Sequence, residues 1–167
     1  METTTIIDKK EFDTIDNFGI LPEIQNLNFD RIKHKMALKE SLGWSEEKIN
    51  LAEREYKRYL TLIKLHINKR IVPSKLMDEF WHMHILDTKS YREDCQQIFN
   101  RFIDHFPYFG IYGQEDHQNL LNEFEETKKM YQSVFNTEIG DAFASRCEDH
   151  ACHVVTECAC RVEGACK

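Results

Sequence analysis

Residues that interrupt helices are scarce in this chain, and their scarcity most constrains the possible fold. Only three prolines and six glycines occur among 167 residues. The segments between them are rich in Leu, Lys, Glu, Met and Phe, which favour helices and recur here at helical spacing. The sequence therefore predicts an all-α fold over residues 6–138, a small bundle of four to five helices, followed by a flexible Cys-rich tail over residues 139–167.

Four segments carry the helical pattern. In chain order they cover residues 29–42, 45–67, 73–99 and 118–135. Gly43 can take the left-handed conformation that ends the first segment, and Ser45 can cap the second. Pro73 cannot continue a preceding helix, so a single third helix should begin there and run to about Phe99. Asp116 is the expected cap of the fourth.

Charge and composition limit the partners of the chain. With a net charge of −7 and a pI near 5.6, the chain lacks the concentrated Lys and Arg that bind nucleic acid. No stretch has the roughly eighteen apolar residues of a membrane span, and the N-terminus does not resemble a signal peptide. We therefore predict a cytoplasmic protein, in which thiols stay reduced and six cysteines suit metal binding or modification better than disulfides.

A histidine-bearing segment, residues 78–88, is the densest motif of the predicted body. His82 and His84 are two residues apart, which on a helix means roughly 200° of rotation, so they should face opposite ways. The pairs that share a face are Asp78 with His82, and His84 with Asp87. His84 also falls on the apolar stripe of this helix, which predicts that its imidazole is buried.

Two interpretations of this segment remain open. In the first, Asp87 and Tyr91 satisfy a buried His84 and the group only fixes helix packing. In the second, imidazoles and carboxylates form a nitrogen and oxygen site suited to zinc or iron, helped by His105 from the following loop. The candidate ligands are Asp78, His82, His84, Asp87 and His105.

The last 21 residues hold five of the six cysteines and two of the eight histidines. Their spacing lacks the paired C-x2-C knuckles of zinc fingers, so a folded finger is not expected. Thiolates this dense suit reversible binding of zinc or copper(I). The candidate ligands are Cys147, His150, Cys152, His153, Cys158, Cys160 and Cys166. Cys95, on the core side of the third segment, is instead expected to pack as a small hydrophobe.

The leading functional hypothesis is a non-catalytic helical domain whose tail binds a soft metal ion. One alternative is a carrier or precursor whose tail cysteines are modified by a partner enzyme. A further alternative is a metal-dependent enzyme that uses the His82 and His84 helix, although no catalytic residue is predicted. The tail cysteines could also form nothing specific.

Residues 72–110 resemble the glycine-rich domain-containing protein-like family. The shared motifs are Val72-Pro73-Ser74, Asp78 to Thr88, Tyr91, Asp94-Cys95 and Asp104 to Gly110. The resemblance implies no established activity, substrate or cofactor; plant members are associated with development and stress, and many bacterial members have glycine- and cysteine-rich C-termini. Where the family usually has paired histidines this chain has Asp104-His105, which still permits a site that accepts an oxygen ligand.

Overall fold

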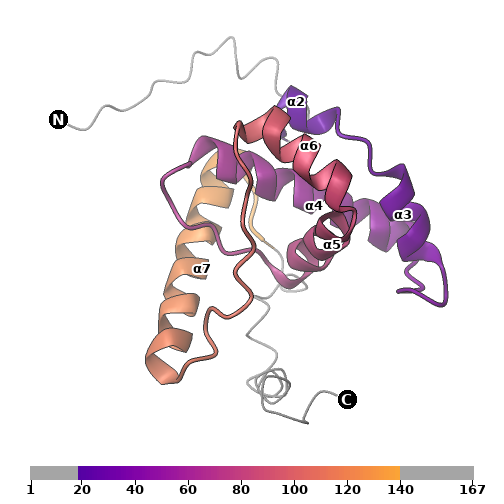
Figure 1. Ribbon diagram of the computed structural model, residues 1–167. Helices are drawn as coiled ribbons and strands as arrows, with labels where there is room; N and C mark the ends of the chain where they lie inside the picture. The colour runs from indigo at the N-terminus through magenta and orange to yellow at the C-terminus, as the bar shows by residue number, and fades with distance from the viewer. Residues whose placement is uncertain (1–18, 140–167) are drawn as a thin grey trace.

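The computed structural model describes residues 19–139, and this part of the chain is all α-helical, as predicted (Figure 1). In chain order the helices are α2 (Pro22–Gln25), α3 (Asp30–Ala37), α4 (Glu46–Leu65), α5 (Lys75–Leu86), α6 (Thr88–Phe99) and α7 (Gln114–Phe135). None of these helices is long and apolar enough to cross a membrane. The Cys-rich tail lies outside the described residues.

Helix α4 is the centre of the bundle. Its N-cap is Ser45, as predicted, and the Ser45 side chain accepts a hydrogen bond from the Lys48 backbone at 3.3 Å. Helices α2, α3, α5 and α7 all pack against α4. Tyr56 of α4 is fully buried between the rings of Phe29 and Phe80, so aromatic packing joins three parts of the chain at the core.

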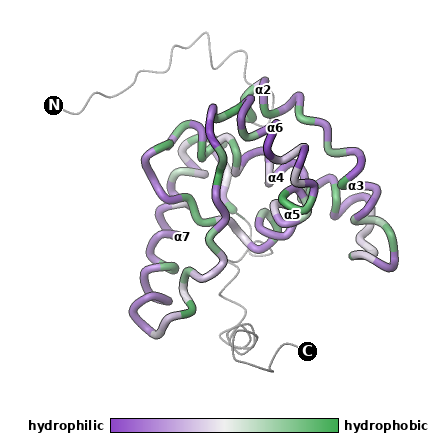
Figure 2. The backbone as a smooth tube through the Cα atoms, viewed as in Figure 1, coloured by the Kyte–Doolittle hydropathy of each residue, from purple (hydrophilic) through white to green (hydrophobic). Residues whose placement is uncertain are grey.

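Helix α7 stands at one side of the bundle and is mostly hydrophilic along its visible length (Figure 2). Tyr131, near its C-terminal end, joins the main core. Closer to its start, Leu120 and Phe124 form a second, smaller cluster with Val72 and Phe109. These contacts attach the long connection between α6 and α7 to the rest of the domain.

The first predicted helix is shorter than expected. Helix α3 ends at Ala37 instead of Leu42, and Leu38 takes an extended conformation with ψ 135°. The Gly43 and Trp44 amides donate back to the Leu38 and Met36 carbonyls at 2.9 and 3.1 Å, so the turn closes on the helix end. Gly43 does adopt the predicted left-handed conformation, with φ 59°.

The third predicted helix, residues 73–99, is in fact two helices. Asp87 separates α5 from α6 with φ −84° and ψ 68°, and its carboxylate accepts from the Ser90 amide at 3.4 Å. Asp87 therefore caps α6 and does not pair with His84, which corrects the expected role of this residue. The extra boundary and the one-turn α2 bring the described helices to six.

The fourth predicted helix begins earlier than expected, at Gln114 instead of Gln118. Its N-cap position is Gly113, and Asp116 lies within the first turn. The Asp116 carboxylate reaches back to accept from the Gly110 and Tyr112 amides at 2.7 and 3.1 Å. Asp116 thus ties the preceding loop to the helix start, where an anion is also favoured by the helix dipole.

Candidate metal site

The two histidines of α5 lie on opposite sides of the helix, as their spacing predicts. His84 is buried, with 2% of its surface exposed, whereas the His82 side chain is 49% exposed. Ser74 caps the start of α5 by accepting from the Met77 amide at 3.4 Å. One helix therefore presents one imidazole to the core and one to the surface.

His84 is held by two polar partners in the core. The His84 Nε2–Asp94 Oδ2 distance is 3.0 Å, so Nε2–H donates to the carboxylate. The Tyr56 hydroxyl lies 3.0 Å from Nδ1. Burial raises the pKa of Tyr56 well above its ordinary value, so this hydroxyl keeps its proton and can donate to Nδ1 when the ring proton is on Nε2.

Both His84 nitrogens thus have a partner within the protein. The rings of Phe29 and Tyr91 meet it edge-on at 4.9 and 5.0 Å between centroids. The arrangement agrees with the interpretation of His84 as a packing residue. The hydrogen-bonding partners, however, are Tyr56 and Asp94 instead of the predicted Asp87 and Tyr91.

Tyr91 links the histidine helix to the loop that follows α6. Its hydroxyl accepts from Trp81 Nε1 at 2.9 Å and donates to the Ile103 carbonyl at 2.5 Å. These bonds fix the loop two residues before His105. Cys95, one turn along α6, is buried as predicted, and burial raises the pKa of its thiol, which makes it a poor thiolate ligand.

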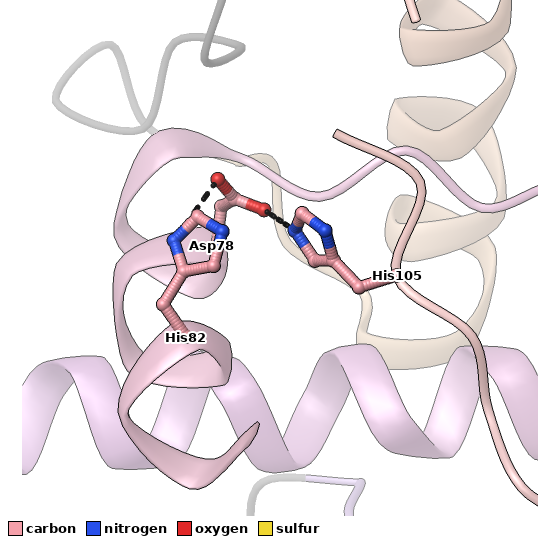
Figure 3. Close-up of side chains that lie close together, drawn as sticks. All are labelled: Asp78, His82 and His105. Atoms are coloured by element: carbon pink, nitrogen blue, oxygen red, sulfur yellow. Dashed lines mark hydrogen bonds and ion pairs between the residues drawn. The ribbon is translucent and has the colours of Figure 1, made fainter. Parts of the chain in front are cut away.

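On the surface side of α5, Asp78 lies between two imidazoles (Figure 3). His105 Nε2 is 2.9 Å from Asp78 Oδ1, and His82 Nδ1 is 3.6 Å from Asp78 Oδ2. One ligand atom from each of the three residues can be chosen so that all lie within 4.8 Å of one another. We call Asp78, His82 and His105 the outer cluster.

The outer cluster is enclosed on one side and open on the other. The side chains of Asp78 and His105 are 8% and 10% exposed, whereas that of His82 is 49% exposed. The Trp81 ring packs on His105 with 4.5 Å between centroids, and the His82 and His105 rings are equally close. Packing therefore orients His105, while solvent reaches the cluster past His82.

The spacing of the cluster suits a metal ion. Two ligand atoms about 2.0–2.1 Å from zinc at a tetrahedral angle are separated by about 3.3 Å. The two imidazoles lie 2.9 and 3.6 Å from different oxygens of the Asp78 carboxylate, and one ligand atom from each residue lies within 4.8 Å of the others. Two nitrogens and one oxygen are a donor set used by zinc and by non-haem iron. Three protein ligands also leave a coordination position for water or another molecule.

The predicted ligands thus divide into three groups. Asp78, His82 and His105 come together, His84 lies apart in the core, and Asp87 is a helix cap. The tail ligands lie outside the described residues. Sequence spacing could not identify Tyr56 as a partner of His84, because the two are 28 residues apart and only tertiary packing brings them together.

The fold and the outer cluster define a small all-α domain with a candidate two-histidine, one-carboxylate metal site. The chain belongs to the UCP032817-like family, an uncharacterised family whose model matches residues 19–134. No curated protein and no solved structure matches the chain. The resemblance to glycine-rich domain-containing proteins stays a prediction from the motifs of residues 72–110.

Proposed function

We propose that the domain binds a divalent transition metal, zinc or iron, through Asp78, His82 and His105. The observation that supports this function is the convergence of three ligand atoms within 4.8 Å from a helix and a separate loop. Asp78 accepts a hydrogen bond from His105 Nε2 at 2.9 Å, and His82 Nδ1 lies 3.6 Å from the same carboxylate, so a metal would replace the proton on His105 Nε2 and compete with any proton on His82. Affinity should therefore fall on acidification.

The partial exposure of the cluster favours an open site over a closed structural one. Structural zinc sites normally have four protein ligands, and the described residues supply three here. A metal in this position would keep a water molecule, whose acidity it increases. Metal-dependent hydrolysis is thus the reaction class that the donor set allows, and a bound metal is its first requirement.

Cobalt(II) titration tests the outer cluster alone once the thiolates of the second candidate site, the tail, have been removed. The protein would be a full-length variant with all five tail cysteines replaced by serine. We expect one cobalt ion to bind with d–d bands of a nitrogen and oxygen site and no thiolate charge-transfer band. Asp78→Asn and His105→Gln should each weaken binding by roughly ten- to a hundredfold or more.

His34→Gln is the matched control, because His34 is an exposed histidine on α3, outside the cluster. The His34→Gln variant should bind cobalt with the same affinity as the parent protein. Unchanged affinity in both Asp78→Asn and His105→Gln would refute the outer cluster as a metal site. Circular dichroism of each variant would establish that helix content is retained.

A second candidate function belongs to the tail and rests on the sequence alone. Five cysteines and two histidines within 21 residues favour reversible binding of zinc or copper(I) in a cytoplasmic, reducing environment. The full chain should then show a thiolate-to-cobalt charge-transfer band that truncation after Gly140 removes while the helical circular dichroism signal persists. Retention of that band after truncation would exclude the tail as its source.

Covalent modification of the tail by a partner enzyme is the alternative use of the same cysteines. The intact mass of protein purified from its host, without chelator and after reduction, decides between the two. A mass difference from the sequence that maps beyond Asp141 would support a carrier or precursor. An unmodified mass together with bound metal would support the metal-binding tail.

A further inference from the structure

A cavity of about 330 Å³ lies beside the outer cluster but is not part of it. Its walls come from the end of α4, the segment before α5, Trp81 and the loop after α6. The Trp81 ring separates the two features, since it lines the cavity and also packs on His105. This volume is within the range of small-molecule pockets, which is about 300–1,000 Å³.

Five of the fifteen residues that line the cavity are aromatic. Tyr59 and Trp81 line it with their rings 5.3 Å apart, and each directs its polar group elsewhere. The Tyr59 hydroxyl donates to the Ile71 carbonyl at 3.0 Å, and Trp81 Nε1 donates to Tyr91. Both rings are buried and have polar partners within the protein, so they contribute apolar wall to the cavity and need no polar partner from a ligand.

The loop after α6 adds aromatic side chains that are open to solvent. Phe102 and Phe106 line the cavity and are 53% and 62% exposed. Exposed large apolar groups beside a concave surface commonly mark a binding site. A planar ligand inserted here would cover these rings and remove their surfaces from water.

Positive charge surrounds the cavity although the chain as a whole carries −7. Its lining includes Lys69, Arg70 and Arg101, against a single acidic residue, Asp104. Arg70 is paired with Glu123 at 3.3 Å, whereas Lys69 and Arg101 form no ion pair with the residues that the structure describes. The lining thus carries three cations against one carboxylate, although Glu126 also lies within electrostatic range of Lys69, and this excess of positive charge favours an anionic group.

We propose that the cavity binds a small organic anion with a planar aromatic body, such as an aryl carboxylate or aryl sulfonate. The aromatic body lies against Trp81 and Phe106, and the anionic group faces Lys69 and Arg101. Arginine suits this role because its planar guanidinium donates two parallel hydrogen bonds to a carboxylate or sulfonate. The proposal does not depend on metal in the outer cluster.

Two fluorescent probes of similar shape separate the two parts of the proposal. Anilinonaphthalene sulfonate carries the anionic group, and uncharged phenylnaphthylamine lacks it. We expect the full-length protein to bind one sulfonate probe. The double variant Lys69→Gln/Arg101→Gln should weaken the sulfonate by about tenfold and phenylnaphthylamine by less than about twofold. Phe106→Ala should weaken both probes by about three- to tenfold.

Lys39→Gln removes a cation far from the cavity lining and should leave both affinities unchanged. Probe titration in the presence of a metal chelator tests independence from the metal site and should give the same affinities. The proposal is overturned if no saturable one-to-one complex forms. It is equally overturned if Lys69→Gln/Arg101→Gln weakens the binding of both probes to the same extent, or if Lys39→Gln weakens sulfonate binding as much as the double variant does.

Discussion

His82 and His84 lie within one turn of the same helix but on opposite sides of it, and they therefore have different roles. His84 is hydrogen-bonded to Asp94 and to Tyr56 inside the core, at 3.0 Å in each case. His82 lies half exposed beside Asp78. Burial makes the hydrogen bonds of His84 matter for folding, because an unpaired polar group in the core loses its hydration without compensation.

Replacing each histidine by alanine should therefore give opposite results. We expect His84→Ala to lower the free energy of unfolding by about 2–4 kcal/mol, because it leaves a cavity and unpairs the Tyr56 hydroxyl. His82→Ala should cost less than about 1 kcal/mol but weaken metal binding at the outer cluster by roughly ten- to a hundredfold or more. Urea unfolding and cobalt titration measure the two effects. Equal stability losses would contradict these roles.

Tyr131 has a buried hydroxyl that is hydrogen-bonded to two charged side chains, Glu55 and Arg58. It donates to Glu55 Oε2 at 2.6 Å and accepts from the Arg58 guanidinium. Burial, and then the Glu55 carboxylate, raise the pKa of Tyr131 well above the ordinary tyrosine value. The phenol therefore keeps its proton in the folded protein at a pH at which an unfolded chain would lose it.

This shift predicts a loss of stability at alkaline pH. The raised pKa favours the folded state below the ordinary value of about 10, and that contribution is lost as the pH rises through the folded-state pKa. At pH about 8, Tyr131→Phe should cost about 1–3 kcal/mol of unfolding free energy. By pH about 11 the difference in unfolding free energy between Tyr131→Phe and the parent protein should narrow by about 1 kcal/mol. Urea unfolding at both pH values measures it.

Tyr56 and Tyr91 are also buried, and their pKa values are also raised. Both residues are present in the parent and in Tyr131→Phe, so their ionisation does not affect the difference in unfolding free energy between the two proteins. A difference between parent and Tyr131→Phe that stays constant with pH would show that ionisation of Tyr131 does not contribute.

Along the helices, the spacing of apolar residues predicted which side chains are buried better than it predicted where each helix begins and ends. The stripe expected on the core side of residues 73–99 is buried: Leu76, Phe80, Met83, Tyr91, Cys95 and Ile98. The same stripe continues across Asp87, so its period alone could not reveal the break between α5 and α6. The local signal was Asp87 itself, whose carboxylate can cap a following helix.

The outer cluster was predictable only in part for the same reason. Asp78 and His82 are four residues apart, so helical geometry alone brings them together. His105 joins them from a loop fixed by the bond between Tyr91 and the Ile103 carbonyl, which is a tertiary contact. Residue spacing carries no information about such a contact.

Gly110 determines how that loop meets α7. Its φ is 88°, and a Cβ atom there would lie 2.6 Å from Leu120 Cδ2. Gly110→Ala should therefore cost about 2–4 kcal/mol, from backbone strain and overpacking together. Gly43→Ala, which has positive φ but only ordinary contact with Lys39, should cost about 1 kcal/mol. Thermal and urea unfolding compare the two. Equal costs would mean that Leu120 moves aside.

For the whole molecule, the long connection between α6 and α7 links the features proposed to bind ligands. It supplies His105 to the outer cluster, and three phenylalanines and Arg101 to the neighbouring cavity. Figure 1 shows this segment passing along the bundle between α6 and α7. Because the outer cluster forms only when the segment is packed against α5, metal should bind the folded protein far better than the unfolded chain.

Zinc should therefore stabilise the full-length protein. Free zinc at a hundred times its Kd adds about 2.7 kcal/mol, or roughly 5–15 °C in Tm, if only the folded state binds. A tail that binds zinc equally in both states adds nothing to Tm. The increase should accordingly survive replacement of the tail cysteines and disappear in Asp78→Asn and His105→Gln, with His34→Gln as control. Scanning calorimetry with and without zinc measures it, and an increase that instead follows the tail cysteines would place the stabilising metal there.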